Sequence, residues 1–308
     1  MSHSEIPLDS SLCRTLNEAI SQFSGSPCQI QQVYDVGGGS ISRTVIAQTA
    51  SARWFVKLNS ADLHDMFEAE ADGLTALGVC PALRVPRVIA HGVSGRQSYL
   101  VLEHLNLQPL RERDSGTRAA RALAELHRIE GGRFGWHRNN FIGSSPQHNG
   151  VERTWPLFFA RQRLLPQLEL ARRKGDKGKL GKLIADGERL AEKLPAMFVD
   201  YQPDISLLHG DLWHGNAALD ELGVLALFDP AVYYGDREAD LAMCELFGGF
   251  PDSFYAAYRQ AWPLANGFEQ RKTLYNLYHV LNHLNLFGSG YLHQAERMVA
   301  TLLAEIGR

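Results

Sequence analysis

The sequence has few cysteines and no long apolar run. The four cysteines among 308 residues lie far apart and form no CxxC pair, which excludes a disulfide scaffold and a cysteine-rich zinc module. No apolar run reaches the length of a bilayer helix. Residues 1–12 are polar and lack the apolar segment of a signal peptide. We therefore expect a soluble, cytoplasmic protein with no membrane partner.

An excess of charge of either sign is also absent. The chain has 31 Lys and Arg residues against 34 Asp and Glu residues, a net charge of −3, which argues against a general polyanion binder and against nucleic acid as the partner. Apolar residues make up 45% of the chain and charged residues 21%, as in a folded globular protein. This length is enough for one large or two modest domains.

The first third of the chain has the patterning of a small sheet. Residues 29–36, 42–48 and 53–58 are rich in β-forming residues and predict an antiparallel meander. Apolar residues at helical spacing predict a helix over 62–78. Two more strands are expected over 88–91 and 99–103.

The rest of the chain is mostly helical. Residues 207–208 and 224–228 predict one small hairpin. Helices are expected, with a possible kink at Pro166, over 118–128, 155–170, 180–194, 254–262, 271–287 and 295–306. A sheet with one helix followed by a helical domain favours an α+β, protein-kinase-like fold with two lobes, 1–105 and 106–308.

The strongest chemical signal is the run HGDLWHGN over 209–216. It places Asp211 five residues before Asn216, and Asp229 follows another apolar run. An aspartate on such a loop can orient an acceptor hydroxyl and take its proton, while an asparagine and a second aspartate can hold one Mg²⁺ ion. Ordinary loop residues are the alternative, but the three together predict a phosphoryl-transfer site.

Two further features fit a nucleotide. The glycine-rich turn Gly37, Gly38, Gly39 and Ser40 lies between two predicted strands and would bring backbone N–H groups close to phosphate. It is not a full GxGxxG motif, because Ser42 stands where the last glycine would be. Lys57 ends a strand and needs a carboxylate partner; Glu70 fits best, with Glu68 as the alternative.

These segments resemble the fructosamine kinase (ketosamine 3-kinase) family, which belongs with the aminoglycoside-phosphotransferase-like kinases. The likeness covers nearly the whole chain, and residues 209–216 and 228–243 carry most of it. Shorter matches are Gly37–Ile41, Phe55–Lys57, Met66–Glu70, Leu126–Arg128, Phe134–Trp136, Leu246–Phe250 and Leu281–Gly288.

The resemblance implies ATP-dependent phosphorylation of the third-carbon hydroxyl of a ketose joined to an amine, free or on a protein. The phosphoester then decomposes and frees the amine, so the activity is a deglycation repair. The implied roles are Asp211 as base, Asn216 and Asp229 as Mg²⁺ ligands, Lys57 and Glu70 as the phosphate-gripping pair, Glu103 to Leu105 as the adenine hinge, and Trp213 as a platform for the sugar.

The chain departs from the family pattern at two positions. Ser40 stands where some relatives carry a cysteine, which makes a redox switch in that loop doubtful. His214 stands where relatives usually have a small residue; it either tunes the acceptor site or points to solvent, and solvent is the preferred interpretation.

Other interpretations stay open from the sequence. The acceptor could be an aminoglycoside, choline or another amino alcohol, or the chain could be a nucleotide-binding pseudokinase. His279 and His283 could share a metal, although packing is favoured because no third ligand is evident. The basic stretch 172–182 is interrupted by glycines and is expected to be a solvated loop. The oligomeric state is not predicted.

Overall fold

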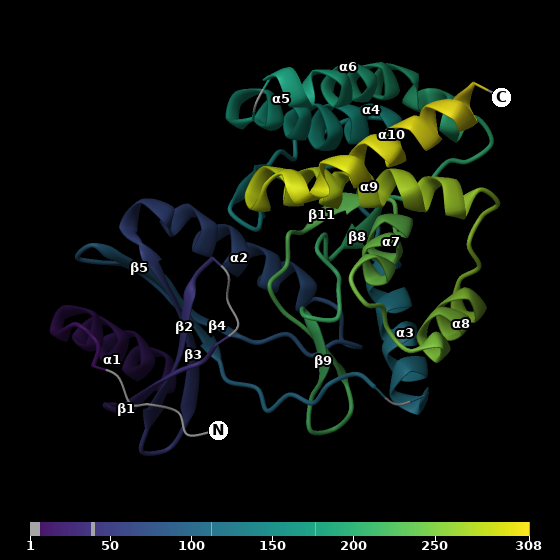
Figure 1. The fold of residues 1–308 in the computed structure, drawn as a ribbon. Coiled ribbons are helices and arrows are strands. Elements are labelled where there is room, and N and C mark those ends of the chain that lie inside the picture. Colours follow the sequence, from purple (N-terminus) through teal and green to yellow (C-terminus); the bar gives the residue numbers. More distant parts are fainter. Residues whose placement is uncertain (1–6, 38–40, 112, 176, 308) are drawn as a thin grey trace.

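The computed structural model describes residues 7–37, 41–111, 113–175 and 177–307. It contains a five-stranded antiparallel sheet in the order β1-β2-β3-β5-β4 (Figure 1). The strands are β1 (Ile30–Asp35), β2 (Arg43–Thr49), β3 (Arg53–Ser60), β4 (Val88–Ser94) and β5 (Gln97–Glu103). The predicted meander and the two later strands are confirmed.

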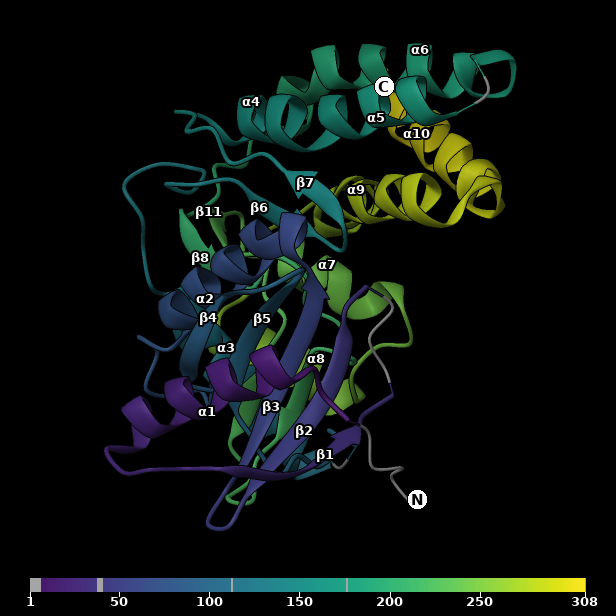
Figure 2. The same cartoon turned by 90° about the vertical axis from the view of Figure 1, so that its left-hand side faces the viewer.

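One helix lies against each face of this sheet (Figure 2). The helix α1 (Ser10–Ser24) packs on Val56 and Val101, whereas α2 (His64–Leu77) packs on Leu100 and Leu102. Neighbouring residues of a strand point to opposite faces. Lys57 follows Val56, so its side chain lies on the face that α2 covers.

The helix α1 was not predicted from the sequence. Its signals are local: the Asp9 side chain accepts hydrogen bonds from the N–H groups of Ser11 and Leu12 at 2.9 and 3.3 Å, and Gly25 ends the helix with φ +68°. Leu12, Leu16 and Ile20 form its buried stripe. This regular spacing of apolar residues was the signal that could have revealed the helix.

The remainder is mainly helical. Figures 1 and 2 show α4, α5, α6 and α10 on the far side of α9 from the sheet. The helices are α3 (Arg113–His127), α4 (Trp155–Phe159), α5 (Leu165–Lys174), α6 (Lys177–Lys193), α7 (Glu238–Leu246), α8 (Asp252–Ala261), α9 (Phe268–Phe287) and α10 (Leu292–Ile306). None in the described ranges is long and apolar enough to cross a membrane.

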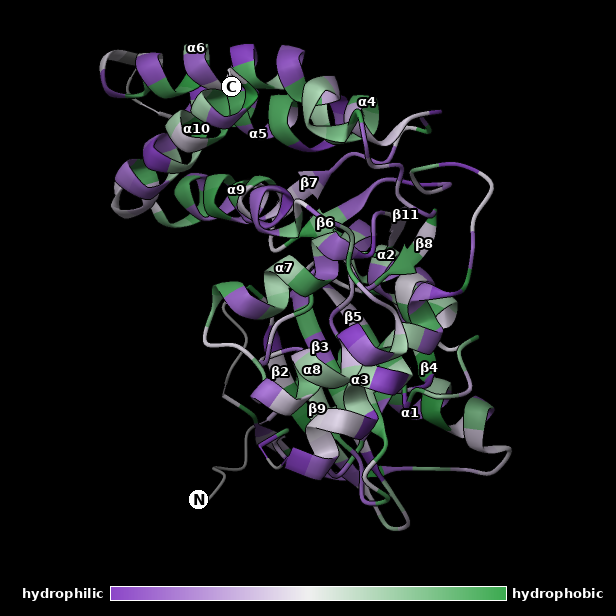
Figure 3. Ribbon diagram, turned by 90° about the vertical axis from the view of Figure 1, so that its right-hand side faces the viewer, coloured by the Kyte–Doolittle hydropathy of each residue, from purple (hydrophilic) through white to green (hydrophobic). Residues whose placement is uncertain are grey.

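The helices differ from the expectations in three places. The loop expected over 172–182 is wrong, because α6 begins at Lys177; hydrophilic and hydrophobic residues alternate along this helix in Figure 3, and its apolar residues lie in the core. The helix α7 was missed because all residues from Glu238 to Cys244 are buried and show no one-sided pattern. The helix expected over 155–170 contains a π-helical segment, Ala160–Leu164, just before Pro166, which has no N–H to donate.

The predicted hairpin is also wrong in its pairing. Residues 207–208 belong to β8 (Ser206–Leu208), which pairs with β11 (Tyr233–Gly235). Residues 225–227 form β10 (Leu225–Leu227), which pairs with β9 (Ala217–Leu219). A further pair is β6 (Asn140–Ile142) with β7 (Ser145–Gln147). Three-residue strands carry too little periodicity to reveal their partners.

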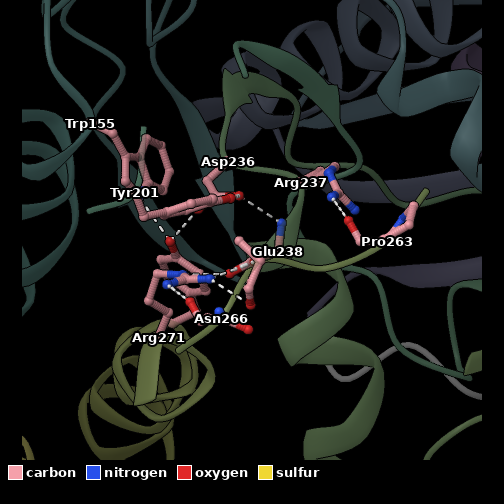
Figure 4. Close-up of polar contacts among 10 residues, drawn as sticks. Trp155, Tyr201, Asp236, Arg237, Glu238, Pro263, Asn266 and Arg271 are labelled. Carbon is pink, nitrogen blue, oxygen red and sulfur yellow. Dashed lines mark hydrogen bonds and ion pairs between the residues drawn. The ribbon is translucent and has the colours of Figure 1, made fainter. Parts of the chain in front are cut away.

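A buried polar network joins α7 to α9 (Figure 4). Arg271 donates to both oxygens of Glu238 at 2.7 and 3.0 Å, and both side chains are almost fully buried. The Arg271 guanidinium also lies over the Tyr201 ring at 3.7 Å from its centroid. Tyr201 and Tyr275 donate to the two oxygens of Asp236 at 3.0 and 2.5 Å. Burial, together with the charge of Glu238, raises the pKa of Asp236 to about 7.

Replacing Arg271 with methionine is expected to reduce the free energy of unfolding by about 3–5 kcal/mol, because it leaves the Glu238 carboxylate buried without its partner. Lys182→Met is the matched control, since Lys182 pairs with Asp186 on the surface of α6 and such pairs contribute about 0.5 kcal/mol. Urea denaturation followed by circular dichroism measures both. Equal losses in the two variants would contradict the prediction.

Candidate active site

Asp211 lies on a loop that directly follows β8. The chain turns at Gly210 with φ +83°, and a Cβ atom there would lie 2.0 Å from the carbonyl oxygen of Ala231. Only glycine fits this close approach of two backbone segments. The turn therefore sets the position of Asp211 through the backbone.

His209 links this loop to the one that carries Asp229. Its Nδ1 accepts a hydrogen bond from the Asp211 N–H at 3.2 Å, so its proton is on Nε2, which donates to the Phe228 carbonyl oxygen at 3.0 Å. Burial lowers the pKa of His209, which keeps the imidazole neutral. One buried ring thus fixes the chain beside two candidate site residues.

Asp240 of α7, a residue not predicted from the sequence to have a role, holds the same loop from the side of α7. Its carboxylate accepts hydrogen bonds from the N–H groups of His209 and Gly210 at 2.8 and 2.9 Å. The Nε2 atom of His127 lies 3.2 Å from the Asp240 carboxylate, and the Nδ1 atom of His127 lies 2.7 Å from the Tyr258 hydroxyl. Burial alone would raise the pKa of Asp240, but these donors lower it overall. An acidic residue in an apolar helix was the available signal.

Asn216 and Asp229 lie next to Asp211. The Asn216 amide nitrogen donates to the backbone oxygen and the carboxylate of Asp211, at 2.9 and 3.3 Å. Neither bond uses the side-chain oxygen Oδ1 of Asn216, which is an atom of the kind that can bind a metal ion. The backbone carbonyl oxygen of Asn216 accepts a hydrogen bond from the Phe228 N–H at 3.2 Å. Asp229 has φ +57°, the single positive φ at a non-glycine residue in the described ranges. Such strain gathers at functional sites.

Lys57 brings the sheet, α2 and the Asp229 loop together. Its Nζ lies 2.7 Å from Glu70 Oε1 and 2.5 Å from Asp229 Oδ1. Burial would lower the pKa of Lys57, but the two carboxylates raise it above its usual value. Burial also raises the pKa of Glu70, and Lys57 offsets this only in part. Of the two partners that the sequence left open, Glu70 makes the contact.

Glu68 pairs elsewhere and helps fix α2. Arg138 lies 3.2 Å from Glu68 and 3.3 Å from Asp65, and the Trp136 indole donates to Asp72 at 2.7 Å. These contacts tie α2 to the segment that enters β6. They thereby hold the helix that carries Glu70.

The surroundings of Asp211 raise the pKa of its carboxyl group. Burial, followed by the nearby charges of Asp229 and Asp240, raises the pKa of Asp211 to about 7. A carboxyl group with a pKa near neutrality can both accept and release a proton at physiological pH. The arrangement therefore suits proton transfer to or from a bound hydroxyl.

A cavity of about 1150 Å³ contains these residues. Lys57, Glu70, Asp211, Asn216 and Asp229 line it. So do the other candidates within the described residues except His214: Gly37, Glu103, Leu105 and Trp213. The Glu103 side chain is held by Arg84 at 2.6 Å and Arg87 at 3.3 Å. Gly38, Gly39 and Ser40 lie outside the described residues.

The histidines that drew attention in the sequence do not share a ligand set. His214 is exposed, and its ring meets that of Trp213 edge-on at 4.8 Å. His279 and His283 both line the cavity, and the Nδ1–H of His283 donates to the His279 carbonyl oxygen at 2.8 Å. Within the described residues no group of three or more His, Cys, Asp or Glu side chains could hold a metal ion. The pair Asn216 and Asp229 is not such a group, because it has two members and one of them is an asparagine.

Comparisons with known proteins point to one family. The fructosamine kinase family model matches residues 12–305. A probable ketoamine kinase of Synechocystis sp. is 45% identical, with 94% of this chain and 96% of that protein covered. Ketosamine-3-kinase of Mus musculus is 39% identical, with 83% and 89% covered.

Solved structures agree. The crystal structure of a candidate fructosamine-3-kinase from Haemophilus somnus superposes with a TM-score of 0.84 at 29% identity and covers 94% of this chain and 96% of that one. The aminoglycoside phosphotransferase APH(4)-Ia, in a ternary complex, gives a TM-score of 0.63 at 15% identity, with 95% and 98% covered. This second likeness is one of fold. The α+β, protein-kinase-like fold is confirmed.

His279→Gln is expected to make stability less sensitive to acid. Burial lowers the pKa of His279 to about 3, whereas an unfolded histidine titrates near 6.5. The unfolded chain therefore binds more protons below pH 6.5, and this group removes about 2–4 kcal/mol of stability between pH 7 and pH 4. Urea denaturation across that range measures the change. The exposed His293→Gln control should leave the slope unaltered, and an unaltered slope in His279→Gln would refute the assignment.

Proposed function

The chain belongs to the fructosamine kinase family, and we propose that it transfers the γ-phosphoryl group of ATP to the third-carbon hydroxyl of a ketosamine, free or protein-bound. The observation that carries this proposal is the meeting of Lys57, Glu70, Asp211, Asn216 and Asp229 in one cavity. These residues come from distant parts of the chain. They match the parts that phosphoryl transfer needs.

Asp211 is the proposed catalytic base. The substrate hydroxyl would donate its proton to the Asp211 carboxylate as its oxygen forms a bond to the γ-phosphorus and the bond to the ADP oxygen breaks. The raised pKa of Asp211 supports this role, because a base with a pKa near neutrality takes the proton most effectively. His209 and Asp240 would hold the loop in register.

Lys57 would contact the α- and β-phosphates, with Glu70 keeping its ammonium group in place. The backbone of Gly37, Gly38, Gly39 and Ser40 would lie along the phosphates, and Glu103 to Leu105 would meet adenine. We accordingly propose residues 1–105 as the nucleotide-binding lobe and 106–308 as the lobe that binds the acceptor.

Asn216 and Asp229 are the proposed Mg²⁺ ligands. Both offer oxygen atoms, as Mg²⁺ requires, and the Asn216 amide nitrogen is already engaged with Asp211, so its oxygen faces away from that contact. The cavity also favours a cation: of its described lining residues, Lys57 alone is a lysine or arginine, against five acids. When bound, Mg²⁺ would neutralise phosphate charge.

Trp213 is proposed to stack on the sugar ring, since it lines the cavity two residues after the base. No role follows for the exposed His214. An aminoglycoside acceptor is not favoured, because the kinase that acts on such a compound is similar in fold only. A pseudokinase is not favoured either, because the site retains its acid, amide and lysine groups.

Asp211→Asn is expected to lower kcat by about 10²–10⁴-fold with little change in the KM for ATP, because the amide cannot accept the proton. Transfer of labelled phosphate from ATP to synthetic fructose- and ribulose-amines measures this. The exposed Asp204→Asn variant serves as control. A kcat equal to that of the unchanged protein would remove Asp211 from the mechanism.

Chelation of divalent cations is expected to abolish transfer, and added Mg²⁺ to restore it. Asp229→Asn should raise the Mg²⁺ concentration that gives half of full activity by about tenfold or more, since a carboxylate is lost from the ligand set. Titration of Mg²⁺ against initial rate is the measurement, again with Asp204→Asn alongside. Full activity under chelation would contradict the metal assignment.

A further inference from the structure

A row of aromatic rings extends from the catalytic loop to the mouth of the cavity. Trp213 lies 6.4 Å from Phe247 between ring centroids, and Phe247 lies 4.6 Å from His283. His283 in turn lies 5.3 Å from Phe287 and 5.2 Å from Tyr291. All five line the cavity. Phe287 is 56% exposed, so its large apolar ring is left partly uncovered at the opening.

The backbone around Phe247 is shaped to present this ring. Phe247 directly follows α7, and the next two residues, Gly248 and Gly249, have φ +97° and +70°. Side chains other than hydrogen are strained in that conformation. Tyr255 fixes the turn, because its hydroxyl accepts from the Phe250 N–H at 2.9 Å. Trp213 comes from the loop after β8, His283 and Phe287 from the end of α9, and Tyr291 from the 3₁₀ turn Ser289–Tyr291.

His283 supplies a hydrogen-bond acceptor within the row. Its Nδ1–H is used by the His279 carbonyl oxygen, so its Nε2 carries a lone pair. Burial lowers the pKa of His283, which keeps the ring neutral at physiological pH. Neutral imidazole and aromatic faces attract a cation without a full counter-charge.

The row carries no carboxylate of its own. The acids among the described lining residues are Glu70, Glu103, Asp211, Glu221 and Asp229, and none belongs to α7, α9 or the turn that follows α9. Glu245, two residues before Phe247, is paired with Lys272 at 2.8 Å. A polycation would need several carboxylates here. A single ammonium group with an alkyl chain needs only the rings and one acceptor.

We propose that Phe247, His283, Phe287 and Tyr291 form the subsite for the amine of the ketosamine, with the ammonium N–H donating to His283 Nε2 and the alkyl substituent lying along Phe287 and Tyr291. This subsite rests on the proposed function, and it adds the feature that separates a ketosamine from a simple ketose. The substituent would leave the cavity past Phe287, where a lysine side chain of a protein could enter.

Two matched ligands test the subsite by equilibrium binding: 1-deoxy-1-propylamino-fructose and its neutral isostere, 1-O-propyl-fructose. The protein is expected to bind the amine about tenfold more tightly, because the ether lacks the hydrogen bond from a charged donor and the attraction between a positive charge and the ring faces. His283→Phe keeps a ring but removes the acceptor, and should abolish this preference. Phe287→Ala should weaken both ligands alike. His293→Phe, an exposed control, should change neither.

Equal affinity for the two ligands, no binding of either, or a preference that survives His283→Phe would overturn the subsite. Phosphate transfer from ATP to the amine, measured in parallel, separates the two proposals. Binding with the expected preference but without transfer would support the subsite and count against the proposed function. Phosphate transfer without a preference for the amine would support the proposed function and count against the subsite.

Discussion

The ammonium group of Lys57 is the contact on which the arrangement of the site depends. It lies between carboxylates from α2 and from the loop after β10, so one buried charge joins the sheet, its helix and the catalytic part of the chain. A buried lysine without partners would lose its proton. Here two acids keep it charged, and it limits where Glu70 and Asp229 can lie. The contacts of Trp136 and Arg138 with α2 reinforce the same geometry.

The surroundings of two nearby acids, Asp240 and Asp211, shift their pKa values in opposite directions. Asp240 receives two backbone N–H groups and the His127 imidazole, so its charged form is stabilised and it fixes the loop. Asp211 receives one amide and faces two like charges, so its charged form is disfavoured. Two aspartates, both close to His209 and Gly210, thus acquire pKa values on opposite sides of the usual range. Burial acts on both in the same direction, so the difference comes from the donors around Asp240 and from the like charges that face Asp211.

Much of this could be predicted from sequence, but unevenly. The five strands and α2 follow from local periodicity, and Asp211, Asn216 and Asp229 follow from their spacing. The pairing of β8 with β11 could not be read, because three residues carry no period. Asp240 and α7 were missed for a related reason: a helix buried all round has no polar face to mark it. Glu70 could be preferred over Glu68 from the helix face that it shares with Leu74 and Leu77, and it makes the contact with Lys57. The pairing of Glu68 with Arg138 could not be read, because Arg138 is distant in sequence.

The aromatic row shows what sequence spacing cannot supply. Trp213, Phe247 and the 283–291 segment are 34 residues or more apart, and their spacing gives no sign that they meet. Only the folded chain places them in one row beside Asp211, the proposed base. The cavity then divides by charge: acids and one lysine line the end proposed for the phosphates, while neutral rings line the end proposed for the acceptor. A group that carries one positive charge and no phosphate is favoured at the second end, and a metal-neutralised triphosphate at the first. The two substrates would therefore be sorted by electrostatics before either is positioned for transfer.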